Sequence, residues 1–403
     1  MASLLQRYIS VRRRDILLAT KNAITDMDTV SAATAIHRGG PYLGGRSVAK
    51  RVAEIVTGRM SNQLSHESAS DAWRELRHSL PESTSPQIWF MLESLAQAVG
   101  CFDASADCGE KGVEGLSRSR TPRDRFIGAI QARDVDAATE ALRSLPRGEP
   151  SRADVAHYLW LWSGGVEGEP QWSTDSDWLT LVGGASVTIV GPAPAAEGVS
   201  PVPPGSLVAR VIAPGVTQWP TSDVAEGRCN LAYANSKSTK WFIREGAVAD
   251  LEKFRYLSYR TSSGDALGLS HSRVAFHHKA LLPMPWDRTN MVPVAAWDLL
   301  HVPDAQVAIV ASNFFASRTA YTANDVRFDA ERNQATDQSG STGIVFERCV
   351  SFSFHNIGAH LNFMANLAQA GSVSFDAEGS AVVAMSYRDY LKEIDELYGV
   401  TKV

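Results

Sequence analysis

The sequence SVTIVGPAPAAEG, residues 186–198, decides the fold. It starts with a largely β-branched apolar run, which is typical of a strand buried on both faces of a parallel sheet. The run ends at Gly191, and Pro192, Ala193 and other small residues follow. In open α/β sheets, ligands bind outside the carboxyl ends of strands, where such a loop lets backbone N–H groups approach a phosphate. The loop is neither a Walker A loop nor a GxGxxG fingerprint, and most turns of this kind bind nothing.

Similar strands and helices alternate through the rest of the chain, which predicts a doubly wound, Rossmann-like α/β sheet. The predicted strands are residues 207–212 (LVARVI), 229–234 (CNLAYA), 274–276 and 307–311 (VAIVA). Helices are expected at residues 248–254, 292–300, 361–370 and 387–398.

The first 160 residues favour helices, because their apolar residues recur at spacings of three and four. The expected helices are residues 16–35, 46–60, 70–80, 86–99 and 153–162, with a helical hairpin at 124–146 in which Asp134 caps the second helix. Residues 103–122, rich in Ser, Gly and charge, are expected to form a loop. The stretch SGGVEGEPQWSTDSD, residues 163–177, is the best linker candidate. We therefore predict a helical N-terminal domain at 1–170 and an α/β domain at 171–403.

The bulk composition excludes several classes of protein. The 403 residues are 44% hydrophobic and 21% charged with a net charge of −5, which is globular and lacks the basic footprint of a nucleic-acid binder. The four cysteines are scattered without CxxC spacing, which favours reduced thiols in a cytoplasmic protein. No apolar run is long enough to span a bilayer. The basic residues 12–14 favour a solvated helix face, with peripheral contact to the inner membrane face as the alternative.

Four segments of the C-terminal half resemble the sialyltransferases, both the animal-type family and its bacterial relatives. VGPAP at residues 190–194 is similar to the family's VGN(G/S)PS-like turn, and the strands at 207–212 and 229–234 follow it in the family's order. Asn235 matches the asparagine after the third strand, whereas Pro192 replaces the asparagine of the turn. Residues 353–376, SFHNIGAHLNFMANLAQAGSVSFD, resemble the family's closing segment sHDPxxxxxFxxxLxxAGxxxxD.

The resemblance implies a GT-A-like variant of the doubly wound sheet and a set of site residues. The nucleotide of the donor would be bound by Gly191, Pro192, Ala193, Asn235 and Ser236, and His355 would be the general base. From the residues alone, His355 ends a strand-like run at 350–354 and precedes a helix. A neutral imidazole there either accepts a proton or merely forms a local hydrogen bond.

Other polar residues are weaker candidates. His277, His278, Asn313 and Tyr321 are candidates for acceptor or phosphate contacts, and for the histidines a packed or surface role is equally open. No metal and no other cofactor is expected. Two stretches match the metal-binding Asp-x-Asp pattern, at residues 134–136 in the helical half and at 175–177 in the linker. We interpret both as chance matches because of these positions. A monophosphate leaving group can be stabilised by hydroxyls, basic side chains and helix N-termini instead.

The resemblance therefore implies an inverting glycosyltransferase of bacterial glycan biosynthesis. The resemblance implies a CMP-activated donor, with sialic acid or a related keto-sugar acid as the sugar, and a glycan or lipid-linked acceptor. The alternative is a non-catalytic protein of the same fold that binds a nucleotide or a glycan, and the altered turn at Pro192 favours it. A nucleotide-dependent enzyme unrelated to sugars is a third hypothesis, because fold alone does not fix function.

Overall fold

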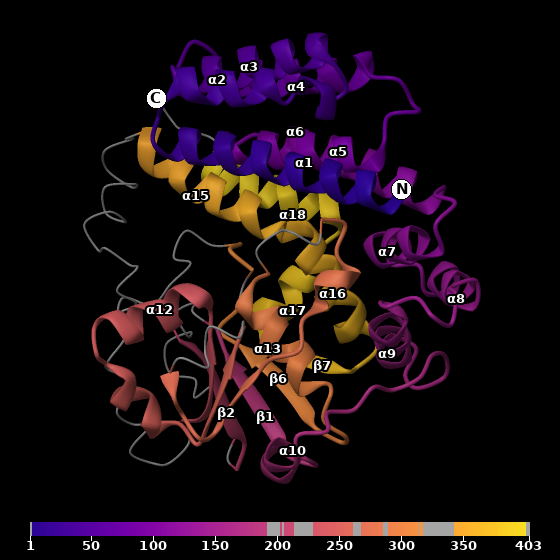
Figure 1. The fold of residues 1–403 in the computed structure, drawn as a ribbon, viewed down its shortest axis with the longest axis vertical. Coiled ribbons are helices and arrows are strands. Elements are labelled where there is room, and N and C mark those ends of the chain that lie inside the picture. The colour runs from indigo at the N-terminus through magenta and orange to yellow at the C-terminus, as the bar shows by residue number, and fades with distance from the viewer. Residues whose placement is uncertain are drawn as a thin grey trace.

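A parallel sheet and a large helical layer make up the molecule (Figure 1). The computed structural model describes residues 2–191, 202–203, 205–212, 229–260, 267–284, 289–312, 314–316 and 342–399. The strands are β1 (Ser186–Val190), β2 (Leu207–Ile212), β3 (Cys229–Ala234), β4 (Tyr256–Tyr259), β5 (Ser272–Val274), β6 (Gln306–Val310) and β7 (Val373–Phe375). Among the described residues before Ser186 there are helices and no strand.

The helices before the sheet are α1 (Ala2–Thr25), α2 (Thr29–Arg38), α3 (Arg46–Met60), α4 (His66–Ser79), α5 (Pro86–Ala98), α6 (Phe102–Ser117), α7 (Pro122–Ala132), α8 (Val135–Arg143), α9 (Arg152–Trp162) and α10 (Ser176–Val182). Those within and after it are α12 (Ser236–Arg244), α13 (Met291–Leu299), α15 (Thr342–His355), α16 (Ile357–Gln369), α17 (Ala377–Val383) and α18 (Tyr387–Ile394). A π-helical turn, Asp395–Gly399, follows α18.

The sheet order confirms the predicted doubly wound α/β class. The seven strands lie in the order β5-β4-β3-β2-β1-β6-β7, and every neighbouring pair is parallel. The chain runs outward from β1 to β5 and then returns to place β6 on the other side of β1. The direction of winding therefore reverses between β1 and β6, and ligands of open α/β sheets bind at the carboxyl end of such a reversal.

Residues 103–122 were predicted as a loop, and this prediction was wrong because most of them form α6. The small residues serve close packing instead of turns. A Cβ added at Gly109 would lie 2.3 Å from the hydroxyl of Tyr387, and one at Gly112 would lie 2.7 Å from the ring of Phe90. Glycine in this helix lets α5 and α18 approach its backbone, at some cost in intrinsic helix propensity.

Two further element predictions were wrong. The single helix expected at residues 16–35 is two helices, because the chain turns at Met27 with a positive φ of 55° and Asp28 then caps α2 by accepting a hydrogen bond from Ser31 N. The strand-like run at residues 350–354 is the last part of helix α15. Phe346, Val350 and Ser353 in α15 are buried at spacings of four and three, which is the pattern of a helix face and not of a strand.

The C-terminal helices pack against the N-terminal ones (Figure 1). Phe346 and Val350 of α15 belong to the same buried cluster as the apolar residues of α1, α3 and α5. The buried Lys21 of α1 donates a hydrogen bond to Ser353 O at 2.9 Å. After α18, Asp395 accepts hydrogen bonds from the backbone N–H groups at the start of α6. The helical half therefore contains both the first and the last described residues.

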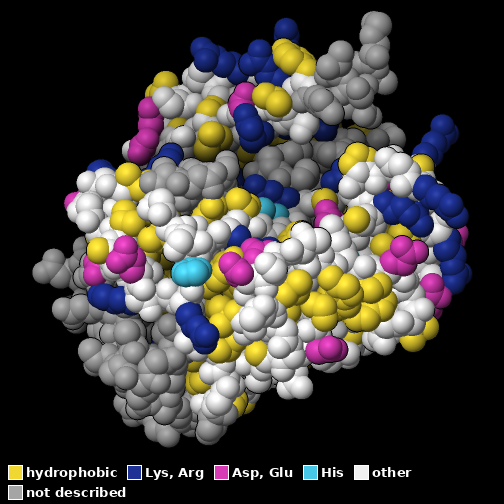
Figure 2. Space-filling view, turned by 60° about the horizontal axis from the view of Figure 1, so that its bottom comes forward, with side chains coloured by type: hydrophobic (Ala, Val, Ile, Leu, Met, Phe, Trp, Pro, Cys, Tyr) yellow, Lys and Arg dark blue, Asp and Glu magenta, His cyan; other side chains and the backbone are white. Residues whose placement is uncertain are grey.

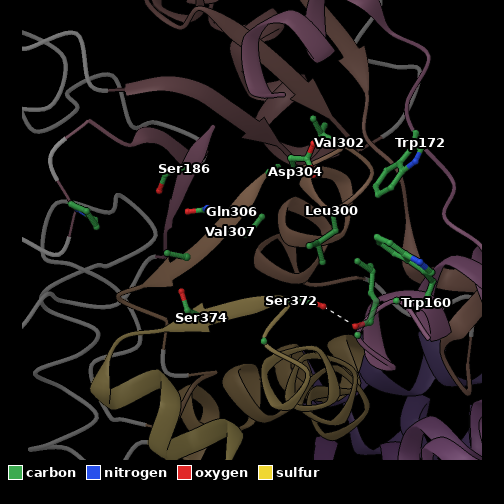
Figure 3. A pocket seen from close by; sticks show the side chains of 17 residues that line it. Trp160, Trp172, Ser186, Leu300, Val302, Asp304, Gln306, Val307, Ser372 and Ser374 are labelled. Carbon is green, nitrogen blue, oxygen red and sulfur yellow. Dashed lines mark hydrogen bonds between the residues drawn. The ribbon is translucent and has the colours of Figure 1, made fainter. Parts of the chain in front are cut away.

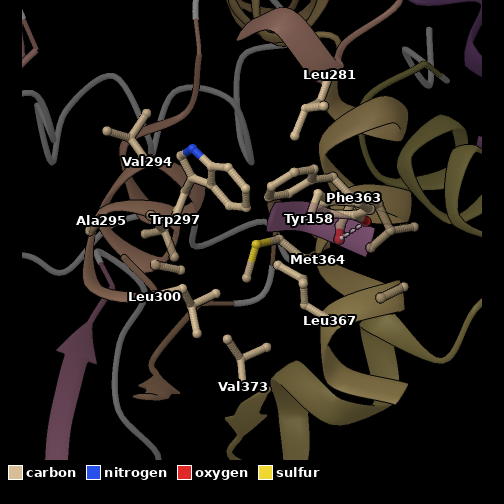
Figure 4. Packing of buried hydrophobic residues seen from close by; sticks show 14 of the residues in the cluster. Tyr158, Leu281, Val294, Ala295, Trp297, Leu300, Phe363, Met364, Leu367 and Val373 are labelled. Carbon is tan, nitrogen blue, oxygen red and sulfur yellow. Dashed lines mark hydrogen bonds between the residues drawn. The ribbon is translucent and has the colours of Figure 1, made fainter. Parts of the chain in front are cut away.

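A second core joins α9 to the sheet helices (Figure 4). Tyr158 of α9 stacks on Phe363 of α16 with ring centroids 4.8 Å apart, and its hydroxyl donates to Phe363 O at 2.9 Å. Trp297 of α13 packs edge-on against the same ring of Phe363. The hydrophobic core is thus continuous across residue 170, and the predicted boundary there stays a prediction.

Charges of both signs are spread over the described surface seen in Figure 2. Among the described residues, no helix combines the length and the apolar character that crossing a membrane requires.

Candidate functional site

All seven strands of the described residues are parallel, so their carboxyl ends meet at one edge of the sheet. Gly191, Asn235, Arg260 and Ala311 directly follow β1, β3, β4 and β6 there. Asp376, which follows β7, links the end of β6 to the start of α17 at this edge. Its Oδ2 accepts a hydrogen bond from Ala311 N at 2.7 Å, and its Oδ1 accepts one from Gly379 N. Gly191 and Asn235, which the sequence predicted as site residues on separate strands, therefore lie at the same edge of the sheet.

Gly191 is a packing residue of this edge. Its N–H donates to Val310 O at 2.8 Å, so this N–H is not available to a phosphate as the sequence suggested. A Cβ added at Gly191 would lie 2.3 Å from Ala311 O and 2.8 Å from the Cβ of Ser312. The glycine lets the ends of β1 and β6 approach each other at the point where the winding reverses.

We expect Gly191→Ala to destabilise the fold by about 1–3 kcal/mol, because the neighbouring atom is backbone and must shift. Denaturant unfolding at neutral pH measures the loss. Gly148→Ala is the matched control, since no atom lies within 4 Å of an added Cβ and no positive φ is involved. Equal stabilities of the two variants would contradict the packing role.

Asn235 and Ser236 begin helix α12 at the end of β3. The Asn235 Oδ1 accepts hydrogen bonds from Lys237 N and Ser238 N, both at 2.9 Å, so the side chain caps the helix. Ser236 is the first residue of the helix and is half-buried. Asn235 thus has the position that the resemblance implies, but its acceptor oxygen already serves the helix N-terminus.

His355 lies at the same edge and faces a small hollow. It is half-buried at the C-terminal end of α15. The hollow is also lined by Asn290, Phe314, Phe315 and His360, and it is too narrow for a water molecule. A substrate therefore enters this hollow only when these side chains move apart.

His360 is the site residue that the sequence did not predict. It is 1% exposed, lines the hollow beside His355, and its Nε2 has no hydrogen-bond partner among the described residues. Its Nδ1 lies 3.1 Å from Nε2 of the fully buried His278. Burial, and secondarily the charge of His355, lowers the pKa of His360 to about 3, so its imidazole is neutral at pH 7.

The turn between α15 and α16 explains why His355 and His360 converge. Asn356 has a φ of 42°, in the left-handed region, and its side chain caps α16 by accepting from Ala359 N. Five residues apart on one continuous helix, the two histidines would face different directions. The break at Asn356 rotates the second helix relative to the first. The asparagine was the one available sequence signal, because asparagine tolerates this conformation and caps helices.

His277 and His278 follow β5, and both are turned inward. His277 Nε2 donates to Arg260 O at 2.5 Å, which leaves Nδ1 as the acceptor of the neutral ring. Burial lowers the pKa of His277, so this ring is poorly suited to a phosphate. His278 is fully buried, stacks on Phe363 and reaches the hollow only through His360. Burial also lowers the pKa of the neighbouring Lys279.

Several predicted residues are placed elsewhere or not described. Pro192, Ala193, Asn313 and Tyr321 lie outside the described residues. Asp134 and Asp175 of the two Asp-x-Asp matches cap helices α8 and α10. In the described part of the chain, no three His, Cys, Asp or Glu side chains lie together as metal ligands would.

A cavity lies at the opposite, amino edge of the sheet (Figure 3). It measures about 750 Å³ and includes Ser186 and Gln306, the first residues of β1 and β6. None of the predicted site residues lines it. The histidine cluster and this cavity are therefore separate features of the molecule.

Comparison of the sequence with protein-family models and with curated protein sequences finds no match.

Proposed function

We propose that the protein is an inverting glycosyltransferase of the sialyltransferase-like variant of this fold. The observation that carries the proposal is the convergence of His355, His360 and Asn290 on one hollow at the carboxyl edge of the sheet. This is the edge at which open α/β sheets bind ligands, and His355 is the residue that the resemblance assigns as base.

In the proposed reaction, His355 accepts the proton of the acceptor hydroxyl as its oxygen attacks the anomeric carbon of a CMP-activated sugar. The bond between that carbon and the phosphate oxygen breaks, and CMP leaves with the electron pair. The acceptor is a glycan or a lipid-linked hydroxyl. The hollow opens to admit the reacting groups, and its aromatic walls, Phe314 and Phe315, then exclude water from them.

Arg260 and Lys279 supply positive charge near the same edge. Arg260 follows β4, and its guanidinium donates to Thr289 O at 3.2 Å, next to Asn290 of the hollow. Its charge also contributes to the lowered pKa of Lys279, so the two cations lie near each other. A phosphate monoanion would relieve their repulsion, which supports an anionic leaving group.

A thermal-shift panel of CMP, CDP, UDP, GDP and ADP, each with and without magnesium, tests the proposal. We expect CMP to raise the melting temperature without magnesium, because a ligand that binds only the native state stabilises it by about 2.7 kcal/mol at a hundredfold excess over Kd. A shift that needs both a diphosphate and magnesium would contradict the proposal.

A non-catalytic binding protein is the second candidate. It is favoured by the engagement of the Gly191 N–H and the Asn235 Oδ1 within the fold, since neither group is then available to a nucleotide. The absence of a shift with all five nucleotides would favour this candidate over the transferase.

A further inference from the structure

The amino-edge cavity has two indole rings on one side and polar side chains on the other (Figure 3). Trp160 of α9 and Trp172 lie together, with Ser186, Gln306 and Ser374 across from them. Asp304 lies between the two groups, in the turn before β6. The volume of about 750 Å³ is within the range of small-molecule sites.

The aromatic side is held rigidly. The rings of Trp160 and Trp172 meet edge to face with centroids 5.2 Å apart. Both neighbours of Trp172 are fixed through the backbone: Gln171 N donates to His157 Nδ1 at 2.9 Å, and Ser173 N donates to His301 O at 2.8 Å. A rigid binding surface loses little conformational entropy when a ligand binds.

His157 is the residue that orders this side. Its Nδ1 accepts from Gln171 N, so its Nε2 carries the proton and donates to Leu300 O at 3.1 Å. Burial, and secondarily His301, lowers the pKa of His157 to about 3, which keeps the ring in this neutral form at pH 7. The imidazole also stacks on Trp160.

The lining selects for an uncharged, hydroxyl-rich ligand. Asp304 is the one charged residue among the described residues that line the cavity, and no Lys or Arg is present among them. Phosphates and carboxylates are therefore disfavoured. The amide of Gln306, the carboxylate of Asp304 and the hydroxyl of Ser374 are exposed donors and acceptors. An indole face packs against the apolar C–H face of a sugar ring while such groups bind its hydroxyls.

We propose that this cavity binds a neutral carbohydrate. The site is distinct from the histidine cluster, because Ser186 and Gly191 lie at opposite ends of β1, roughly 16 Å apart at 3.3 Å per residue. The inference does not rest on the proposed glycosyltransferase reaction. Binding here is measured directly, in the absence of any donor.

Saturation-transfer NMR on the full chain tests the inference with lactose, maltose, cellobiose and chitobiose as probes, and with tetramethylammonium as a cationic probe. We expect at least one disaccharide to receive saturation from the protein, and CMP not to displace it. If none of the four binds with a Kd tighter than about 10 mM, the inference is overturned. Binding of tetramethylammonium alone would overturn it as well, in favour of a cation site.

Two tryptophan variants assign the signal to the cavity. Trp172→Ala is expected to weaken binding of the disaccharide about tenfold, through the loss of one aromatic wall. Trp241→Ala is the matched control, because this tryptophan is also half-buried but lies on α12, outside the cavity lining. Melting temperatures of both variants verify folding. Equal affinities of a folded Trp172→Ala variant and the unmodified protein would overturn the assignment.

Discussion

Replacement of His355 by glutamine is expected to lower kcat by about 10²–10⁴-fold, the usual contribution of a general base. Glutamine keeps the approximate size of the side chain but has no basic nitrogen. His355 is half-buried at the end of α15, so the substitution does not open a large cavity. Because Arg260 and Lys279 are the residues proposed to lie near the phosphate, the affinity for CMP should change little. Donor turnover and the CMP-induced thermal shift together separate the two effects.

The control for this variant is His271→Gln. His271 is exposed and directly precedes β5, at the amino edge of the sheet, so it lies at the edge opposite to the hollow. Its turnover should equal that of the unmodified protein. A His355→Gln variant that keeps full turnover and normal folding would exclude His355 as the base. The same conclusion would follow if the His355→Gln variant turned over more slowly than the unmodified protein only at low pH, where a histidine base is already protonated and inactive.

Acid is expected to unfold the protein between about pH 6 and pH 5. His157, His278, His301 and His360 are each at most 1% exposed, and burial lowers the pKa of all four below the value in an unfolded chain. Because the pKa of each histidine is lower in the folded protein, this stability is present above about pH 6.5 and is lost as the pH falls towards the folded pKa values. One pH unit below 6.5, each histidine costs about 1.4 kcal/mol.

The four histidines together then cost roughly 6 kcal/mol, which is comparable with the whole stability of many domains. They also form two close pairs, His157 with His301 and His278 with His360, so protonation of one disfavours protonation of the other. Urea unfolding at a series of pH values measures the number of protons taken up. His301→Gln should lower that number by about one between pH 6 and 5, whereas His37→Gln, at an exposed histidine, should not. A stability independent of pH over this range would refute the expectation.

The strands that the sequence predicted best are those with long β-branched or apolar runs. Strands β1, β2 and β3 have the predicted limits, because they are central strands buried on both faces. Strands β4 (YLSY) and β7 (VSF) were not predicted, since three or four residues give too short a pattern to distinguish from a loop. Helix α6 is long enough to give a pattern, but its glycines and serines indicate a loop. They form a packing surface only in contact with α5 and α18, which the local sequence does not show.

The site was predicted in part. The position of Asn235 at a carboxyl strand end follows from the strand pattern alone. The contact of His355 with the same hollow as His360 depends on the left-handed turn at Asn356, which short-range patterns do not specify. The inward position of His278 depends on Phe363 and His360, which are more than 80 residues away in the sequence. The position of a site residue was thus predicted where it depends on a single strand. It was missed where it depends on contacts with elements that are distant in the sequence.

The packing of α15 among the N-terminal helices also has a consequence for synthesis on the ribosome. Helices α1, α3 and α5 leave the exit tunnel early, yet the core that they share with Phe346 and Val350 is completed only when the last 60 or so residues have been made. At about 5–20 residues per second, roughly 250 intervening residues take on the order of 12–50 s. During that interval the first helices expose the apolar face that α15 later covers, so the nascent chain would benefit from a chaperone at this stage.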